Sequence, residues 1–245
     1  MSLNYRLKRV LRPYFQTGRL RQFLDRARGL TMTPLTHEEV ARLVGRPDPT
    51  IVEIGCNDGS DTLAFLEAMP TARVYCFEPD PRAILRFKQK LGSRVDRVTL
   101  SEIAISDRNG TITFHMSGSG PVPGEGFDQS GSIRIPKNHL LDHPWVTFDK
   151  AITVKTRTLD DWCAEHAVAN IDFLWMDVQG AEGDVIAGAI DSLKRTRFLY
   201  TEYSNNELYE GQLPLRRLLA LLPSFEVMRR YPGDVLLRNR SLRRN

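Results

Sequence analysis

The segment Ile51–Gly59 constrains the fold of this chain more than any other. It reads Ile-Val-Glu-Ile-Gly-Cys-Asn-Asp-Gly, a short apolar strand that runs into a glycine-containing turn. We expect a helix to begin at Ser60 and a second strand, Val74–Phe77, to lead directly into Glu78. In a parallel α/β sheet, this order places a backbone-lined pocket at a helix N-terminus and an acid at the neighbouring strand tip, where it can hold a ribose. The sequence therefore predicts a nucleoside cofactor site.

The residues of the turn distinguish between nucleoside cofactors. Dinucleotide sites carry the pattern G-x-G-x-x-G, whose glycines let the backbone approach a pyrophosphate. Here Asn57 takes the place of the middle glycine, and Gly59 does not follow the dinucleotide spacing. Glu53 at the end of the first strand would repel a pyrophosphate but suits the ammonium of a methionine moiety. S-adenosylmethionine carries both that ammonium and a ribose, so this pattern favours it over a nicotinamide cofactor.

Composition indicates an ordinary globular chain. Its 245 residues, 41% hydrophobic and 26% charged, are enough for one large α/β domain with a well-buried core. No apolar run approaches the roughly 18 residues of a membrane span, and the chain does not open with a signal-peptide pattern. Three cysteines without a C-x-x-C pair argue for a reducing cytoplasm and against a disulfide framework or a cysteine zinc site. We therefore expect a cytoplasmic protein.

Charge is distributed unevenly along the chain. Residues 4–30 carry eight Lys or Arg against one acid, and residues 229–245 carry six Arg against one acid, so the middle is acidic. We interpret residues 1–45 as a basic helical N-terminal extension or lid. It could pack on its own domain, or it could touch an anionic surface such as the inner face of a membrane. The acidic middle does not fit a nucleic-acid-binding surface.

The remaining chain, residues 46–245, alternates strands and helices, which predicts a mostly parallel sheet. An Asn109-Gly110 pair between alternating runs predicts a hairpin beside the carboxyl edge of the sheet. The strands at 225–229 and 234–238 predict a closing antiparallel pair around Tyr231-Pro232-Gly233. Strands are otherwise expected at 51–55, 73–77, 97–105, 171–176 and 198–203, and helices at 60–69, 81–91, 159–167, 182–194 and 214–222.

Residues 117–149 form a long irregular stretch between predicted strands. Loops of this length inside a compact domain are usually functional or disordered. Placed above the cofactor pocket, the stretch is a candidate substrate lid. Its aromatic residues Phe127, Trp145 and Phe148 could stack on a sugar ring or anchor the loop to the core.

Several motifs, in this order, resemble the FkbM-type S-adenosylmethionine-dependent methyltransferases over about residues 50–205. The most specific is Met176-Asp177-Val178-Gln179-Gly180-Ala181-Glu182, which is similar to that family's strand-end signature. The other matching stretches are Glu53–Gly59, Phe77–Pro79, Ala104–Asp107 and Thr158–Asp160. The resemblance implies a Rossmann-like class I methyltransferase fold: a seven-stranded, mostly parallel sheet with a closing antiparallel hairpin.

The same resemblance implies a cofactor site. Gly55, Asn57 and Gly59 would line the methionine end of S-adenosylmethionine, and Glu78 would hold the ribose hydroxyls. The backbone from Ala104 to Ser106 would meet the adenine. The expected cofactor-contacting set is completed by Glu53, Asp61, Pro79 and Asp177.

Members of the family mostly methylate hydroxyls of sugars or polyketide-type natural products, and a few modify peptide side chains. We therefore expect O-methylation of a sugar, glycan or natural-product acceptor. Two alternatives stay open: a peptide or protein side-chain methyltransferase, and a non-catalytic module that binds a partner or a membrane. The N/D-P-P-Y/F turn of nucleic-acid amine methyltransferases is replaced by Asp177-Val178-Gln179-Gly180, which argues against a nucleic-acid substrate.

A hydroxyl needs a general base before it can attack a methyl group. Asp177 is the first candidate because its strand is central, although it could equally cap the following helix. Glu202 and His143 are further candidates, and His115 lies in the same region of the chain. Asp177 and Glu202 could also join Asn205 in an oxygen-rich magnesium site, but their spacing is no dedicated metal motif, so no residue is assigned as a metal ligand.

Overall fold

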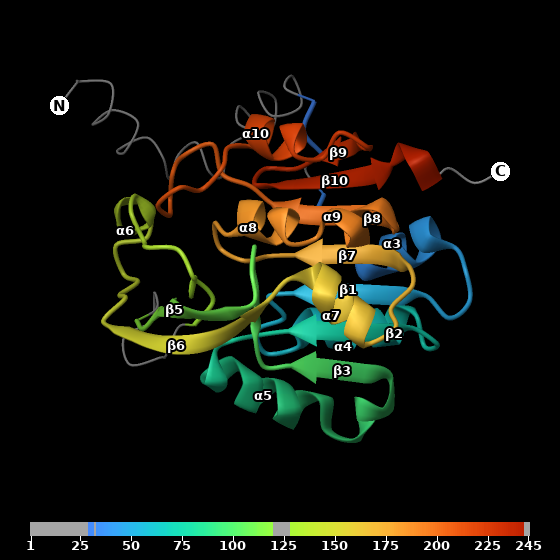
Figure 1. Ribbon diagram of the computed structural model, residues 1–245, viewed down its shortest axis with the longest axis horizontal. Helices are drawn as coiled ribbons and strands as arrows, with labels where there is room; N and C mark the ends of the chain where they lie inside the picture. The colour runs from blue at the N-terminus through green and yellow to red at the C-terminus, as the bar shows by residue number, and fades with distance from the viewer. Residues whose placement is uncertain (1–28, 32, 120–127, 243–245) are drawn as a thin grey trace.

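The computed structural model describes residues 29–31, 33–119 and 128–242 (Figure 1). The basic amphipathic segment before residue 29 and Phe127 of the lid lie outside these residues. In the described part, no helix combines the length and the apolar character needed to cross a membrane.

The described residues contain a central seven-stranded sheet in the order β3-β2-β1-β7-β8-β10-β9. Strands β3, β2, β1, β7 and β8 are parallel, whereas β10 runs antiparallel to both β8 and β9. This is the predicted fold class, including the closing antiparallel pair. The strands are β1 (Thr50–Ile54), β2 (Arg73–Phe77), β3 (Val98–Ser101), β7 (Ile171–Met176), β8 (Thr196–Glu202), β9 (Phe225–Arg230) and β10 (Asp234–Asn239).

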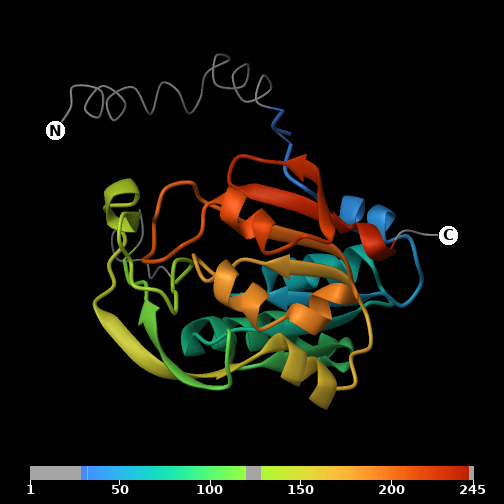
Figure 2. The same cartoon turned by 45° about the horizontal axis from the view of Figure 1, so that its top comes forward.

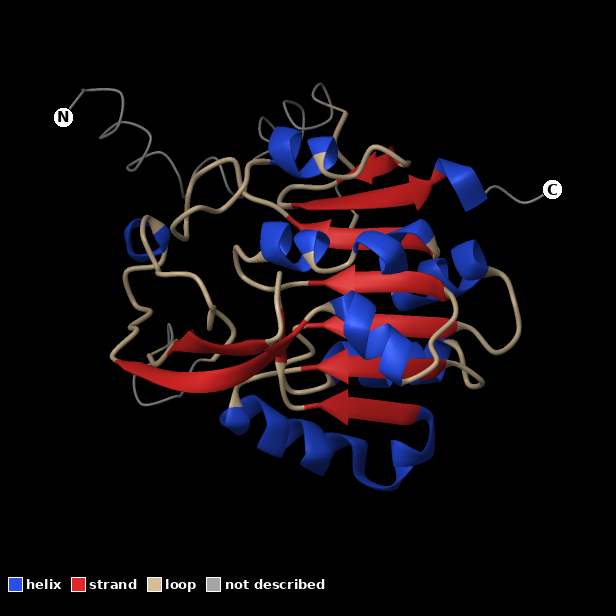
Figure 3. Cartoon of the chain, in the orientation of Figure 1, coloured by secondary structure: helices blue, strands red, loops and turns tan. Residues whose placement is uncertain are grey.

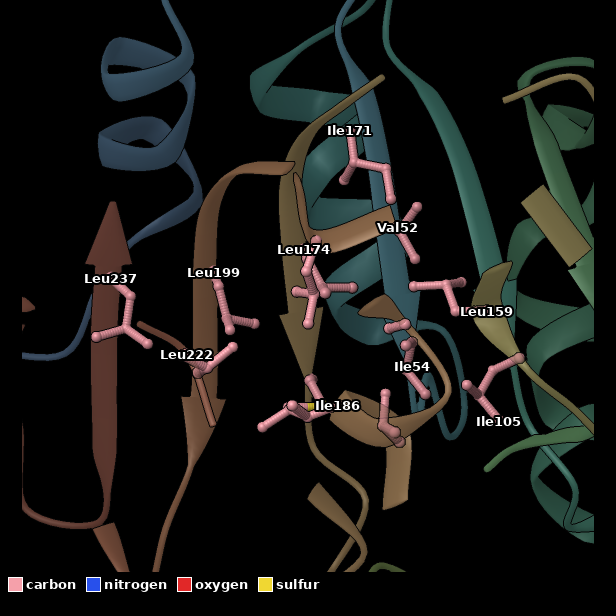
Figure 4. Close-up of a cluster of buried hydrophobic side chains, with 14 of the residues drawn as sticks. Val52, Ile54, Ile105, Leu159, Ile171, Leu174, Ile186, Leu199, Leu222 and Leu237 are labelled. Carbon is pink, nitrogen blue, oxygen red and sulfur yellow. The ribbon is translucent and has the colours of Figure 1, made fainter. Parts of the chain in front are cut away.

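Helices cover both faces of this sheet (Figure 3). They are α3 (His37–Val44), α4 (Ser60–Ala68), α5 (Pro81–Leu91), α6 (His139–Asp142), α7 (Leu159–Glu165), α8 (Glu182–Ala187), α9 (Ile190–Lys194) and α10 (Leu215–Ala220), with 3-10 turns at Gly92–Arg97 and Arg240–Leu242. One apolar cluster joins the sheet to α7, α8, α9 and α10, and a second joins it to α3, α4 and α5. Figure 4 shows the first cluster, in which Val52, Leu174 and Leu199 from neighbouring strands point to the same side. Since both faces of the sheet are covered, the two strands β2 and β7 are apolar along most of their length.

Helix α3 belongs to the packed core even though it precedes the first strand. Thr36 and Glu39 form a reciprocal capping box at its N-terminus. Val40 and Val44 are completely buried in the cluster with α4 and β1. The helical part of the predicted extension that the structure describes is therefore anchored by apolar packing.

A small second sheet lies beyond the carboxyl ends of the parallel strands (Figures 1 and 2). It consists of β4 (Ala104–Ile105), β6 (Lys150–Arg157) and β5 (Gly110–Met116), in that order. The predicted antiparallel excursion is therefore present, but the predicted local hairpin at Asn109-Gly110 is wrong. β5 pairs instead with β6, more than thirty residues later in the sequence, while β4 pairs with the other edge of β6. The single strand predicted over 97–105 is likewise divided between the two sheets.

The helix predicted over 182–194 is interrupted at Gly188-Ala189. A β-carbon at Gly188 would lie 2.1 Å from the carbonyl oxygen of Ser106, so the chain bends where it meets the β4–β5 connection. At the start of the second part, α9, the side chain of Asp160 accepts two backbone hydrogen bonds. The N–H of Asp191 donates to it at 3.0 Å and the N–H of Ser192 at 2.6 Å. A distant acid thus caps a new helix where local sequence predicted a continuous one.

Candidate active site

A cleft of about 1130 Å³ opens at the carboxyl ends of β1, β2, β7 and β8. This is the position at which open α/β sheets bind ligands. The far wall comes from residues 128–133 of the predicted lid and from residues 139–143 around α6. These described parts of the predicted lid therefore line the cleft, and its role in holding a substrate stays a prediction.

Glu78 is fixed at one end of this cleft. Its carboxylate accepts hydrogen bonds from the backbone N–H of Asn57 at 2.9 Å and of Asp80 at 2.8 Å. The residue is only 5% exposed, and burial raises the pKa of Glu78 to about 7 despite these bonds. Because each carboxylate oxygen takes one N–H, lone pairs remain on both for the two hydroxyls of a ribose.

Gly55 lets the first and fourth parallel strands of the core meet at the floor of the cleft. Its φ is +86°, and a β-carbon there would lie 1.8 Å from the carbonyl oxygen of Asp177. The backbone N–H of Asp177 donates to the carbonyl oxygen of Ile54 at 3.0 Å. This bond extends the β1–β7 hydrogen-bond ladder to the last residue of β1 before the turn. Only glycine fits this contact without moving one of the strands.

Three residues of the predicted cofactor set do not line the cleft: Glu53, Gly59 and Ser106. Glu53 is 1% exposed beneath it, where its carboxylate accepts a 2.5 Å hydrogen bond from Thr62 and where burial raises its pKa well above the usual range. A β-carbon at Gly59 would lie 2.7 Å from the side chains of Phe87 and Leu91, so this glycine serves the packing of α4 on α5. The other predicted residues line the cleft: Gly55, Asn57, Asp61, Glu78, Pro79, Ala104 and Asp177.

Asp177 and Glu202 come together at the tips of β7 and β8. The side-chain amide of Gln179 donates to Oδ1 of Asp177 at 2.7 Å and to Oε2 of Glu202 at 3.0 Å. Asp177 reaches the solvent of the cleft, yet protein surrounds most of its carboxylate, and this desolvation raises its pKa. Burial, followed by the charge of Asp177, raises the pKa of Glu202 well above its ordinary value. Of the two, Glu202 therefore holds a proton more readily.

Gln179 also connects this pair to the lid. Its Oε1 lies 3.2 Å from the hydroxyl of Tyr209, which donates at 2.8 Å to the carbonyl of Ser130. The hydroxyl of Ser132 donates at 2.7 Å to the backbone carbonyl of Gln179. The predicted base and the lid thus belong to one hydrogen-bonded network.

His143 lies at the opposite wall of the cleft from the strand tips, beside a buried neighbour. The rings of His139 and His143 are 4.8 Å apart, and the ring of Trp145 is 5.4 Å beyond His143. His139 is 3% exposed with its Nε2 3.1 Å from Ser130 Oγ, and desolvation lowers its pKa to about 4. Both histidines line the cleft, but His139 is buried and held neutral in this way as a packing residue of the wall, whereas His143 is partly exposed. His115 does not line the cleft.

The donor set at the strand tips does not suit a divalent cation. Among the described residues, no group of three His, Cys, Asp or Glu side chains is arranged to hold a metal ion. Asn205 lines the cleft with Asp177 and Glu202. The two carboxylates, however, both accept from the side-chain N–H group of Gln179, so a hydrogen-bond donor stands where a cation between them would have to lie. No observation of this structure favours the magnesium alternative.

Three residues of the site were not predicted from the sequence: Gln179, Tyr209 and Asp128. Asp128 accepts from the Asn57 side chain and pairs with Arg86, so it joins the lid to the cofactor turn. For Gln179 a signal was present, since it stands two residues after the proposed base within the most specific motif. No local pattern marks Asp128 or Tyr209, because their partners are distant in sequence.

The chain matches the methyltransferase FkbM domain over residues 53–236. It is 55% identical over 228 residues to 2-O-methyltransferase NoeI of Sinorhizobium fredii, covering 91% of this chain and 93% of that protein. It is 30% identical over 166 residues to AMB antimetabolite synthetase AmbE of Pseudomonas aeruginosa, but this covers 60% of the chain and only 8% of that protein. Among solved structures, an rRNA methylase from Streptococcus thermophilus aligns with a TM-score of 0.45 and 14% identity, covering 85% of this chain and 99% of that one. So low a score supports no inference about the substrate.

Proposed function

This chain belongs to the methyltransferase FkbM family, and from that premise we propose that it methylates a hydroxyl group of a sugar or glycan acceptor, with S-adenosylmethionine as the methyl donor. The observation that carries the proposal is the 55% identity, over nearly the whole of both chains, to a protein named as a 2-O-methyltransferase. By the same similarity, the 2-hydroxyl of a sugar ring is the first position to test.

The cleft suits S-adenosylmethionine in both charge and shape. Glu78 offers acceptor oxygens for ribose hydroxyls, next to the backbone of the Gly55–Asn57 turn. Farther along, Asp61 and Asp177 give the cleft a negative wall that suits an ammonium and a sulfonium. When bound, this cofactor supplies an electrophilic methyl group on a positively charged sulfur.

In this proposal Asp177 is the general base. It lies in the cleft at the tip of a central strand, where its carboxylate can accept the proton of the acceptor hydroxyl while that oxygen forms its bond to the methyl carbon. The carbon–sulfur bond would break in the same step, and the sulfur would leave as the neutral thioether of S-adenosylhomocysteine. Glu202 lies beside Asp177, and both carboxyl groups accept from the side-chain amide of Gln179. In this proposal the proton received by Asp177 is held between the two carboxyl groups. The lid residues 128–133 and the α6 region exclude water and hold the acceptor close to the methyl group, which supplies much of the acceleration in transfers of this kind.

The test uses purified protein with S-adenosylmethionine labelled in its methyl group. We would offer a panel of oligosaccharides, a polyketide-type alcohol mixture and a peptide mixture, and separate the products by class. Label on oligosaccharide, located at one hydroxyl by linkage analysis and lost in Asp177→Asn, supports the proposal. Label confined to peptide would overturn it in favour of side-chain methylation. Absence of any product with intact S-adenosylhomocysteine binding would favour a binding module.

A further inference from the structure

Gln179 occupies a junction that the proposed reaction does not by itself explain. One side-chain amide contacts Asp177, Glu202 and Tyr209, at 2.7, 3.0 and 3.2 Å. These partners come from three separate parts of the chain: the end of β7, the end of β8 and the segment before α10. The amide therefore links both strand tips to the lid side of the cleft.

The orientation of this amide follows from its neighbours. Asp177 and Glu202 face one end of it, and the ionised carboxylate of Asp177 can only accept hydrogen bonds, so the NH₂ group must point toward this end. The opposite end meets the hydroxyl of Tyr209, whose single hydrogen is shared between Ser130 and Gln179 Oε1. Turning the amide over would place its oxygen against both acids. The network thus has one arrangement in which every member is satisfied.

The backbone of Gln179 is also held in place. Its φ is +51°, a left-handed conformation that non-glycine residues rarely adopt, and Gly180 follows at +94°. A β-carbon at Gly180 would lie 2.8 Å from the side chain of Tyr209. Ser132 fixes the carbonyl of Gln179 from the lid. A strained residue held by contacts on several sides is typical of a preorganised functional site.

We propose that Gln179 is a positioning residue for methyl transfer: its amide holds Asp177 and Glu202 together as a base that shares one proton, and Tyr209 sets the direction of that amide. This inference rests on the proposed function, because the base has a task only if a hydroxyl is methylated. Gln179 itself touches neither the acceptor nor the reacting atoms in this role. Its action is on the readiness of Asp177 to receive a proton.

A direct consequence concerns the titration of Asp177. A hydrogen bond donated to a carboxylate stabilises the charged form, so the bond from Gln179 lowers the pKa of Asp177 against the raising effect of burial. Removing the donor should therefore raise the midpoint of Asp177. A residue that merely tied two loops together would leave that midpoint in place.

The experiment replaces Gln179 with methionine, which keeps the length of the side chain and removes both donor and acceptor. Asp177 is followed by carbon-13 NMR of protein labelled in the aspartate carboxyl groups, with its signal assigned by loss in Asp177→Asn. We expect Q179M to raise the midpoint by about one pH unit, the size expected for one lost hydrogen bond. The matched control is Q89M, at an exposed glutamine of α5 outside the cleft, which should leave the midpoint unchanged. An unchanged midpoint in Q179M overturns the proposal.

The same variants are then compared in the rate of methylation against pH at saturating substrate. We expect the rising limb of Q179M to move to higher pH by the same amount, so that part of the rate returns in alkaline buffer. A rate lowered by one constant factor at every pH would mean a structural role only and overturn the inference. If Q179M does not fold, Y209F carries the test, because loss of its hydroxyl should give a smaller shift in the same direction, and no shift overturns the proposal.

The two arms separate the two proposals. A shifted Asp177 midpoint without methylation of any sugar means that the proposed function fails, although Gln179 still sets the protonation of Asp177. Sugar methylation by the wild type without a shifted midpoint in Q179M means the reverse.

Discussion

The carbonyl oxygen of Asp177 lies 1.8 Å from the point where a β-carbon on Gly55 would be. The first and fourth core strands therefore meet at a distance that excludes every side chain, directly below the carboxylate proposed as the base. Any residue larger than glycine must push Asp177 or the cofactor turn out of place.

We accordingly expect Gly55→Ala to damage both stability and cofactor binding. The left-handed φ of +86° costs about 1 kcal/mol for alanine, and the clash with backbone adds roughly 1–3 kcal/mol. Denaturant unfolding measures the free energy, and calorimetry with S-adenosylhomocysteine measures binding.

The control for that substitution is Gly92→Ala. Gly92 also has a positive φ, +52°, but a β-carbon there would meet nothing within 4 Å. It should lose only the conformational part, about 1–3 kcal/mol for its backbone at φ +52° and ψ −123°, with unchanged cofactor binding. Equal effects of the two alanines would contradict the steric argument.

Cofactor affinity should depend on pH through Glu78. Burial raises the pKa of this acid to about 7 in the free protein, so it is ionised above that value and protonated below it. Only the carboxylate can accept hydrogen bonds from ribose hydroxyls on both oxygens. We therefore expect the affinity for S-adenosylhomocysteine, measured by calorimetry, to be constant above about pH 7 and to fall as pH decreases below it.

The variant Glu78→Gln isolates this effect. It should weaken binding about 10- to 100-fold at pH 8, the loss expected for hydrogen bonds to a charged group, and remove the pH dependence near 7. The control is Glu102→Gln, an exposed acid that pairs with Lys88 outside the cleft. A pH dependence that persists in Glu78→Gln would assign it to another group.

Much of this architecture could be predicted from local sequence. The helix Pro81–Leu91 has its boundaries as predicted because Asp80 caps it, Pro81 starts it and Gly92 follows its last residue. The strands β2 and β7 are short apolar runs between polar residues, and they too match. Elements set by local capping and by apolar runs were therefore predictable.

What could not be predicted depends on distant partners. The helix is interrupted where Gly188 lies against the backbone of Ser106, and β5 pairs with β6 rather than across the Asn109-Gly110 turn. Glu53 was predicted to face the cofactor, but β1 is covered on both faces of the sheet, so the sequence does not reveal into which layer the Glu53 side chain points. The structure turns it toward Thr62 instead.

The free energy of unfolding should depend on pH through His139. Desolvation lowers its pKa to about 4 in the folded protein, against an ordinary value near 6.5. Its contribution is therefore complete above about pH 6.5 and is lost as pH falls toward 4, because the unfolded chain then binds a proton that the folded one rejects. We expect the wild type to lose about 1–2 kcal/mol relative to His139→Gln over this window, measured by urea unfolding. His115→Gln is the control, and a constant difference between wild type and His139→Gln would refute the assignment.

Methylation should persist in a chelator. The amide N–H group of Gln179 faces both carboxylates at the strand tips, and a cation between them would have to displace it. We expect the initial rate in excess EDTA to equal the rate in added magnesium, with the protein dialysed beforehand. A rate that disappears in EDTA and returns with magnesium would show that the metal site rejected above exists.

The sharpest prediction concerns the two acids that Gln179 joins. Asp177→Asn keeps the size of the residue and one acceptor oxygen but cannot accept the hydroxyl proton, so the rate at saturation should fall by about 10²–10⁴-fold. Glu202→Gln should cost less, because burial favours the protonated form of Glu202 and the amide resembles that form. Single-turnover methylation measures both rates, and calorimetry with S-adenosylhomocysteine checks that each variant still binds cofactor. If Glu202→Gln instead loses more of the methylation rate, Glu202 is the base and Asp177 its support. The base must be ionised to accept the proton, so replacing it with an amide should lower the rate more than replacing its neighbour.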